Sequence, residues 1–220
     1  MLKARYVKQF RLAEAWETVG RAAPFLQGGD VDSALAVLRE DGVGPETRYN
    51  KLGRRFFEQI QPGHFNAPSL NLEDATRLEL LEALFDAGWD VDVQDDLGWS
   101  FLHRAVWAES FAAVRFLLER GANPNIRTFD DETPLDFAIQ HFRTNHDGPS
   151  QASALCLEAL ILGGADVYLP FSSESNKYRD RFEWISALPE DRPERQTFFA
   201  ALAKRDAMKQ TSQEPETPNA

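Results

Sequence analysis

The sequence predicts an all-α fold, a row of stacked helix-turn-helix units, because one pattern returns along the chain at a fixed spacing. The helix-opening motif SFLHRA at residues 100–105 is followed 33 positions later by TPLDFA at residues 133–138. The helix-closing motif GWDVD at residues 88–92 likewise lies 33 positions before GANPN at residues 121–125. Two motifs in one register indicate repeated units of a single kind, and such units stack into one extended core.

Capping chemistry marks where the helices of the unit begin and end. Ser100 and Thr133 can accept a hydrogen bond from the free amides of the helices they open, and Pro134 suits a first turn because it has no amide hydrogen. Apolar residues recur at helical spacing over residues 111–120, which predicts an amphipathic second helix. Gly121 can adopt the positive φ that ends this helix. The positions that we expect to be buried are Leu102, Ala105, Leu117 and Leu118.

The pattern is less regular away from these units. A third closing motif, GADV at residues 164–167, begins 43 positions after Gly121, so its unit contains a ten-residue insertion, which we place within residues 141–151. Apolar residues at helical spacing predict a helix over residues 3–20. Residues 43–69 fit the pattern least well, and we interpret them as a lengthened repeat.

Together these motifs resemble the ankyrin repeat, whose period is about 33 residues and whose signature is T-P-L-H-x-A. The resemblance covers about three to four repeats and is best over residues 70–168. It implies an ankyrin-repeat α-solenoid with β-turn fingers and divergent helical caps, in which the fingers and the first helices line a concave binding surface. It also implies that His103, in the histidine position of the signature, makes a structural hydrogen bond to the backbone of its own repeat.

The expected organisation is one ankyrin-repeat domain over residues 1–208, because stacked repeats share a single core. Within it, residues 1–69 form a divergent N-terminal cap and first repeats, residues 70–168 the regular repeats, and residues 169–208 a C-terminal helical cap. Residues 209–220 are polar and poor in aliphatic side chains, so we expect a disordered tail.

Composition restricts the function and the location. The formal net charge of −11 argues against general binding to nucleic acids or anionic membranes, since both need a basic surface. The single cysteine, Cys156, lies in an apolar segment and excludes a disulfide framework, so we expect a buried thiol. No apolar run approaches 18 residues and the N-terminus resembles no signal peptide, so we expect a cytoplasmic protein.

Known catalytic and metal-binding patterns are not evident. His141, His146 and Asp147 could be drawn as a metal triad, but their segment contains Gly and Pro and has no helical His pair, which favours a solvated loop. No phosphate-binding loop, nucleophile elbow or CxxC pair occurs. We therefore expect no catalytic residue, no metal site and no cofactor, and the chain is interpreted as not an enzyme.

Acidic residues are concentrated in the best repeats. Between residues 86 and 132 the chain carries ten acidic and four basic residues. The resemblance places fingers at about residues 92–99 and 125–132. Their carboxylates could form a cation-seeking interface, or they could serve solubility and turn chemistry, in which Asp is favoured anyway. The acids concerned are Asp95, Asp96, Asp130, Asp131 and Glu132.

Tryptophans adjoin these acids. Trp99 precedes the helix cap at the base of the first finger, and Trp107 falls at a first-helix position that ankyrin repeats usually vary and expose. Trp107 could anchor a partner, because large aromatic side chains dominate interface hot spots, or it could pack against the next repeat. Arg104, Gln140 and His141 would share the same groove.

The resulting functional hypothesis is a non-enzymatic protein-binding module that holds a basic partner protein on a concave acidic face. Small acidic ankyrin-like proteins resemble inhibitor or immunity proteins, which can cover the basic active site of a nuclease-like toxin. The alternatives are an adaptor or assembly factor for an intracellular enzyme, and a hydrolase with a site in residues 43–69. The sequence leaves the partner and the oligomeric state open.

Overall fold

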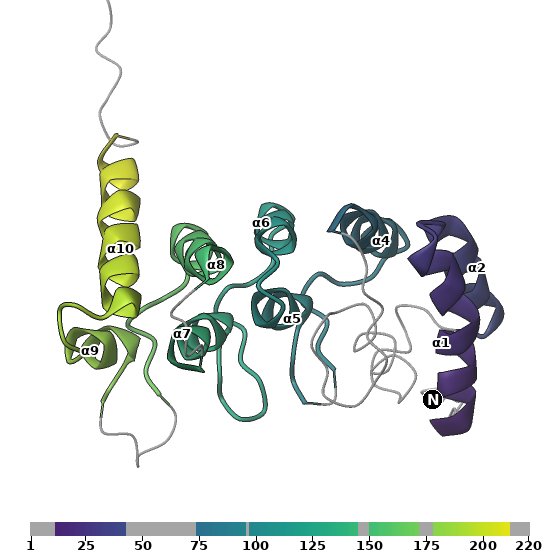
Figure 1. The fold of residues 1–220 in the computed structure, drawn as a ribbon, viewed down its shortest axis with the longest axis horizontal. Coiled ribbons are helices and arrows are strands. Elements are labelled where there is room, and N and C mark those ends of the chain that lie inside the picture. The colour runs from purple at the N-terminus through teal and green to yellow at the C-terminus, as the bar shows by residue number, and fades with distance from the viewer. Residues whose placement is uncertain (1–11, 43–73, 96, 145–149, 172–177, 212–220) are drawn as a thin grey trace, which may run out of the picture.

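Helix pairs follow one another in a row in the computed structural model (Figure 1). The structure describes residues 12–42, 74–95, 97–144, 150–171 and 178–211. Within these ranges the helices are α1 (Leu12–Gln27), α2 (Val31–Glu40), α4 (Asp74–Asp86), α5 (Phe101–Trp107), α6 (Phe111–Glu119), α7 (Pro134–Thr144), α8 (Gln151–Leu162), α9 (Arg181–Ser186) and α10 (Pro193–Thr211).

The repeated helices form two layers. Helices α5, α7 and α9 lie in one layer and α4, α6 and α8 in the other, with α1 and α2 at one end of the row and α10 at the other (Figure 1). The loops that enter α5 and α7 extend beyond the first layer, as β-turn fingers do, and so does the described part of the loop that enters α9. Among the described residues there is no β-strand, and two isolated antiparallel bridges, Gln94 with Ser100 and Pro170 with Asp180, close the bases of two fingers. The all-α solenoid is confirmed.

The same cap opens each helix of the first layer. Ser100 Oγ accepts from the amide of His103, Thr133 Oγ1 from that of Asp136, and an Asp180 carboxylate oxygen from that of Glu183. The side chain three residues after the cap also accepts from the backbone, so two otherwise free amides are satisfied each time. The donor is the capping residue itself at Ser100 and Thr133, and Arg179, one residue before the cap, at α9. Because the third cap opens α9 in the same way, α9 and α10 repeat the helix pair of the preceding units.

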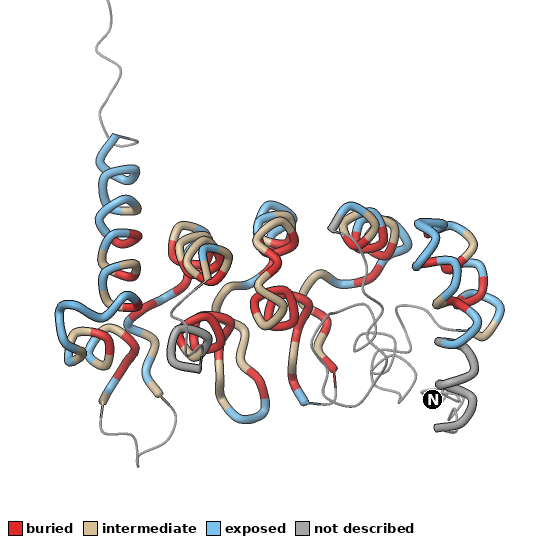
Figure 2. The backbone as a smooth tube through the Cα atoms, viewed as in Figure 1, coloured by how far each residue is buried: buried red, intermediate tan, exposed pale blue. Residues whose placement is uncertain are grey.

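The core lies in the seam between the two layers, where buried positions face one another (Figure 2). Leu102, Ala105 and Leu117 are buried as predicted. Leu118 is only partly buried, so its prediction was wrong: its side chain borders a surface groove between α6 and α8, where it lies against Gly163. Cys156 is buried, and burial raises the pKa of its thiol to about 12.

Segment boundaries differ from the predictions at three places. The first helix continues to Gln27 rather than ending at residue 20, since Pro24 lies inside it without breaking it. The insertion is divided among a longer α7, a longer connection and a longer α8, when these are compared with α5 and α6. Helix α10 continues to Thr211, beyond the expected start of the tail. The lengthened repeat at residues 43–69 and most of the tail lie outside the described residues. None of the helices in the described ranges is long and apolar enough to cross a membrane.

Candidate partner-binding face

The candidate binding face consists of the fingers at residues 92–99 and 125–132 with the first helices α5 and α7, and we call it the finger face. The fingers lie side by side and are joined by hydrogen bonds. Phe129 N donates to Leu97 O at 3.1 Å, and Gln94 Nε2 donates to Arg127 O at 2.7 Å. A neighbouring tie connects the second finger to the third, because Arg127 Nη2 donates to Pro170 O at 2.7 Å. These bonds hold the fingers in a fixed relative position.

Asp95 holds the first finger from within. Its carboxylate accepts from the amides of Leu97 at 2.8 Å and Trp99 at 2.9 Å, and from Arg104 Nη2 at 2.6 Å. Both charged side chains are buried, and the Arg104 guanidinium also lies 4.2 Å from the centre of the Trp99 ring. The expectation that Asp95 and Arg104 offer charge to a partner is therefore wrong, because each neutralises the other beneath the surface.

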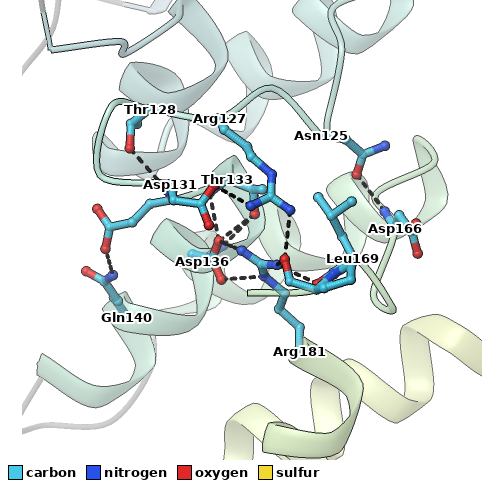
Figure 3. A network of polar contacts seen from close by, with 12 residues as sticks. Asn125, Arg127, Thr128, Asp131, Thr133, Asp136, Gln140, Asp166, Leu169 and Arg181 are labelled. Atoms are coloured by element: carbon cyan, nitrogen blue, oxygen red, sulfur yellow. Dashed lines mark hydrogen bonds and ion pairs between the residues drawn. The ribbon is translucent and has the colours of Figure 1, made fainter. Parts of the chain in front are cut away.

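Only part of the charge of the second finger faces outward. Asp131 forms an ion pair with Arg127 (Figure 3). Glu132 accepts a hydrogen bond at 2.6 Å from Gln140, whose amide is neutral. Asp130 is exposed, and no ion pair involving it or Glu132 occurs among the described residues. Of the five predicted finger acids, these two retain an uncompensated charge in the described part of the chain, while Asp96 lies outside it.

A buried ion pair lies under the second finger. Arg181 from α9 donates to both carboxylate oxygens of Asp136 at 2.9 and 2.7 Å, and its remaining nitrogen donates to Leu169 O at 2.6 Å (Figure 3). Asp136 also caps α7 through Thr133. This pair connects the last two repeats of the described chain and positions the helix that carries Gln140.

Aromatic rings form a cluster at the foot of the fingers. Trp99 lies edge-on to Phe137 with 4.5 Å between ring centres, and Trp107 lies 5.8 Å from Trp99 and 5.9 Å from Phe137. Phe137 is buried, whereas both tryptophans keep part of their surface exposed. Trp107 thus packs against the next repeat, as one of the two interpretations expects, while part of its surface stays exposed.

His103 joins two repeats. Its Nδ1 accepts from Ser100 N at 3.1 Å, which leaves the proton on Nε2 for a bond to Glu132 O at 3.1 Å. The bond to its own repeat agrees with the expected role, and the second bond ties α5 to the next finger. Burial lowers the pKa of His103 to about 4.

Comparison with known proteins identifies the repeats. A family model described as ankyrin repeats in many copies matches residues 72–118. The chain therefore contains ankyrin repeats. It is 44% identical over 66 residues to a protein of Rickettsia bellii (strain RML369-C) and 35% identical over 103 residues to one of Rickettsia felis (strain ATCC VR-1525 / URRWXCal2), both named as ankyrin repeat proteins. It is 42% identical over 69 residues to the human transient receptor potential cation channel subfamily A member 1.

These similarities cover parts of each protein. They extend over 30%, 44% and 31% of this chain and over 19%, 42% and 6% of the three relatives, in the same order. Ankyrin repeats are protein-interaction modules that generally bind rather than catalyse. The finger face of this ankyrin-repeat protein is therefore the first place to seek a bound protein.

Other proposed site residues fall outside what the structure describes. His141 lies in α7, but its side chain is not among those described, and Asp96 lies outside the described residues altogether. His146 and Asp147, which the sequence suggested as members of a metal triad, also lie outside. Among the described residues, no three His, Cys, Asp or Glu side chains gather as metal ligands would.

Sequence reasoning missed the apolar residues at the finger tips. Phe129 is 74% exposed and Leu97 is 38% exposed. The available signal was an aromatic residue inside a finger of mostly polar residues, between Thr128 and Asp130. The predicted site included the acids of the fingers and the adjoining tryptophans but not this residue.

The buried imidazole predicts a pH-dependent stability. The folded-state pKa of His103, about 4, lies below the ordinary value of about 6.5, so the unfolded chain takes up this proton first as the pH falls. The stabilisation is complete above pH 6.5 and is lost as the pH falls toward 4. We expect the free energy of unfolding to fall by about 2 kcal/mol from this group between pH 7.5 and pH 5. Urea unfolding at both pH values checks this; an equal loss in His103→Asn would contradict it.

Gly98 allows the two fingers to touch, which makes it sensitive to a methyl group. Its φ is +77°, and an added Cβ would lie 2.6 Å from Phe129 N. Gly121 has a similar φ of +86° with open space around it. We expect Gly121→Ala to lower the free energy of unfolding by about 1 kcal/mol, and Gly98→Ala by at least about twice as much because finger backbone must also move. Chemical denaturation measures both; equal losses would show that the fingers are not in contact.

Proposed function

We propose that this chain is a non-enzymatic protein-binding module that holds a basic site of a partner protein against the finger face. The observation that carries the proposal is the aromatic cluster at the foot of the fingers. Trp99 and Trp107 are fixed by Phe137 yet keep exposed surface. Large aromatic side chains that lose little freedom on binding are typical interface anchors.

Charge supports a basic partner. The net charge of the chain is −11, and the carboxylates of Asp130 and Glu132 are not paired with a described cation. Glu132 is bonded to Gln140, and its carbonyl accepts from His103, which contacts Phe137, so an acidic group adjoins the aromatic cluster. A partner that places Lys or Arg over this region would find both a carboxylate and aromatic faces.

For the biological role we propose inhibition, with a chain of immunity type that covers a basic active site such as that of a nuclease-like toxin. Strong negative charge on a small binding module supports this role, because a carboxylate surface can take the place of a polyanionic substrate. Binding without any loss of the partner's activity would instead indicate an adaptor or assembly factor.

The test begins with the complex from native cells. We expect a stoichiometric complex to be recovered, and the activity of the recovered partner to fall on addition of this chain. Trp107→Ala should raise the dissociation rate about 30-fold, a loss of about 2 kcal/mol. Phe116→Ala, a half-buried aromatic on the second layer, is the control and should leave dissociation unchanged. Equal effects of the two substitutions would reject the finger face as the binding site.

A further inference from the structure

The two finger tips carry apolar side chains where a water-facing turn normally carries polar ones. Phe129 is 74% exposed, more than any other large apolar side chain among the described residues. Leu97, on the adjoining tip, is 38% exposed. Covering exposed apolar surface with a partner lowers the free energy, so adjoining exposed apolar side chains suggest a contact site.

The tip of the second finger is a defined turn. Thr128 N donates to Glu132 O at 2.9 Å, and Asp131 N donates to Thr128 O at 3.0 Å. Asp131 adopts a φ of +66°, which is uncommon for a residue with a side chain. These constraints turn Phe129 outward, away from the core.

The first finger fixes Phe129 from the other side. Phe129 N donates to Leu97 O at 3.1 Å, and this approach needs a residue without Cβ at Gly98, whose added methyl would lie 3.0 Å from Phe129 Cδ1. Gln94 Nε2 bridges the two fingers through Gly98 O and Arg127 O. The aromatic ring is therefore presented by a prearranged backbone, which lowers the entropy lost on binding.

The charge at the tip of the second finger favours a positively charged group on the partner. Asp130 follows Phe129 directly, is exposed, and forms no ion pair with a described residue. The charge of the neighbouring Asp131 is balanced by Arg127. A cation close to Phe129 would meet the Asp130 carboxylate and could also lie over the aromatic ring.

From these observations we infer that Leu97, Phe129 and Asp130 form a finger-tip site that binds a partner-protein segment with an apolar side chain beside a Lys or Arg. The apolar side chain covers Leu97 and Phe129, and the cation pairs with Asp130. This inference rests on the proposed function for the existence of a protein partner. It extends the finger face from the aromatic cluster to the tips and assigns the chemistry of the segment that binds there.

A phage-displayed library of random 12-residue peptides provides the probe. Peptides are selected on the wild-type chain and counter-selected on Phe129→Ser. We expect enriched sequences to place an aromatic or aliphatic residue next to Lys or Arg. Enrichment of sequences without this pair, or no enrichment over the counter-selection, overturns the inference.

Titration of the strongest selected peptide then locates its site. Phe129→Ser and Asp130→Asn should each weaken binding at least about 10-fold. Tyr168→Ser is the matched control, since Tyr168 is 53% exposed on a different loop, and it should bind like the wild type. If Phe129→Ser binds normally, the finger-tip site is rejected. The proposed function is judged separately, by the effect of Trp107→Ala on the partner from native cells.

Discussion

Arg181→Met is expected to lower the free energy of unfolding by about 3 to 5 kcal/mol, because it leaves the buried Asp136 carboxylate without its cation. Arg181 is 1% exposed and supplies two of the hydrogen bonds that Asp136 accepts. The equivalent change at an exposed ion pair is Arg115→Met, which removes the contact to Glu119 and should cost less than about 1 kcal/mol. Denaturant unfolding of both variants gives the comparison.

The chemistry of this pair allows a second check. Asp136→Asn removes the charge that Arg181 neutralises, so the double variant should be less destabilised than the two single effects predict. Strictly additive losses would mean that the two side chains do not interact. A loss below about 1 kcal/mol for Arg181→Met would mean that the last two repeats are not joined through this pair.

Leu117→Ala should cost about 2 to 5 kcal/mol, since Leu117 is fully buried in the seam between the layers and its truncation leaves a cavity. The same substitution at the partly exposed Leu97 should cost less than about 1 kcal/mol. Repeats depend on their neighbours, so hydrogen exchange should accelerate in α8 and α4 as well as in α6. Acceleration confined to α6 would contradict a shared core.

The architecture could be predicted because its signals are local. Ser100 caps a helix by its own side chain and Gly121 ends one by its own φ, so each marks a boundary without reference to the rest of the fold. The repeat period of 33 residues then predicts that the helix pairs stack in a row. Leu118 shows the limit of this reasoning: its burial depends on how closely α8 approaches α6, which the pattern of one helix does not contain.

The candidate site was predicted less well, because the direction of a side chain in a turn depends on distant partners. Asp95 turns inward since Arg104, nine positions later, meets it there. Asp131 is neutralised by Arg127 through the fold of its own finger. Packing of Trp107 against the next repeat was one of two interpretations, and the sequence did not decide between them because Phe137 belongs to that repeat. Phe129 was not predicted, because its outward direction depends on the positive φ of Asp131 and on the contact with the first finger.

The salt dependence of association with the partner from native cells tests the central claim most directly. Two reversals at the finger face, Asp130→Lys with Glu132→Lys, should slow association and reduce its dependence on ionic strength, because exposed charges steer encounters over about 10 Å at 0.1 M salt. The control pair, Asp32→Lys with Glu79→Lys, changes the net charge equally at exposed sites on α2 and α4. We predict a larger effect for the finger-face pair. If both pairs change the association rate and its salt dependence equally, the partner does not bind at the finger face.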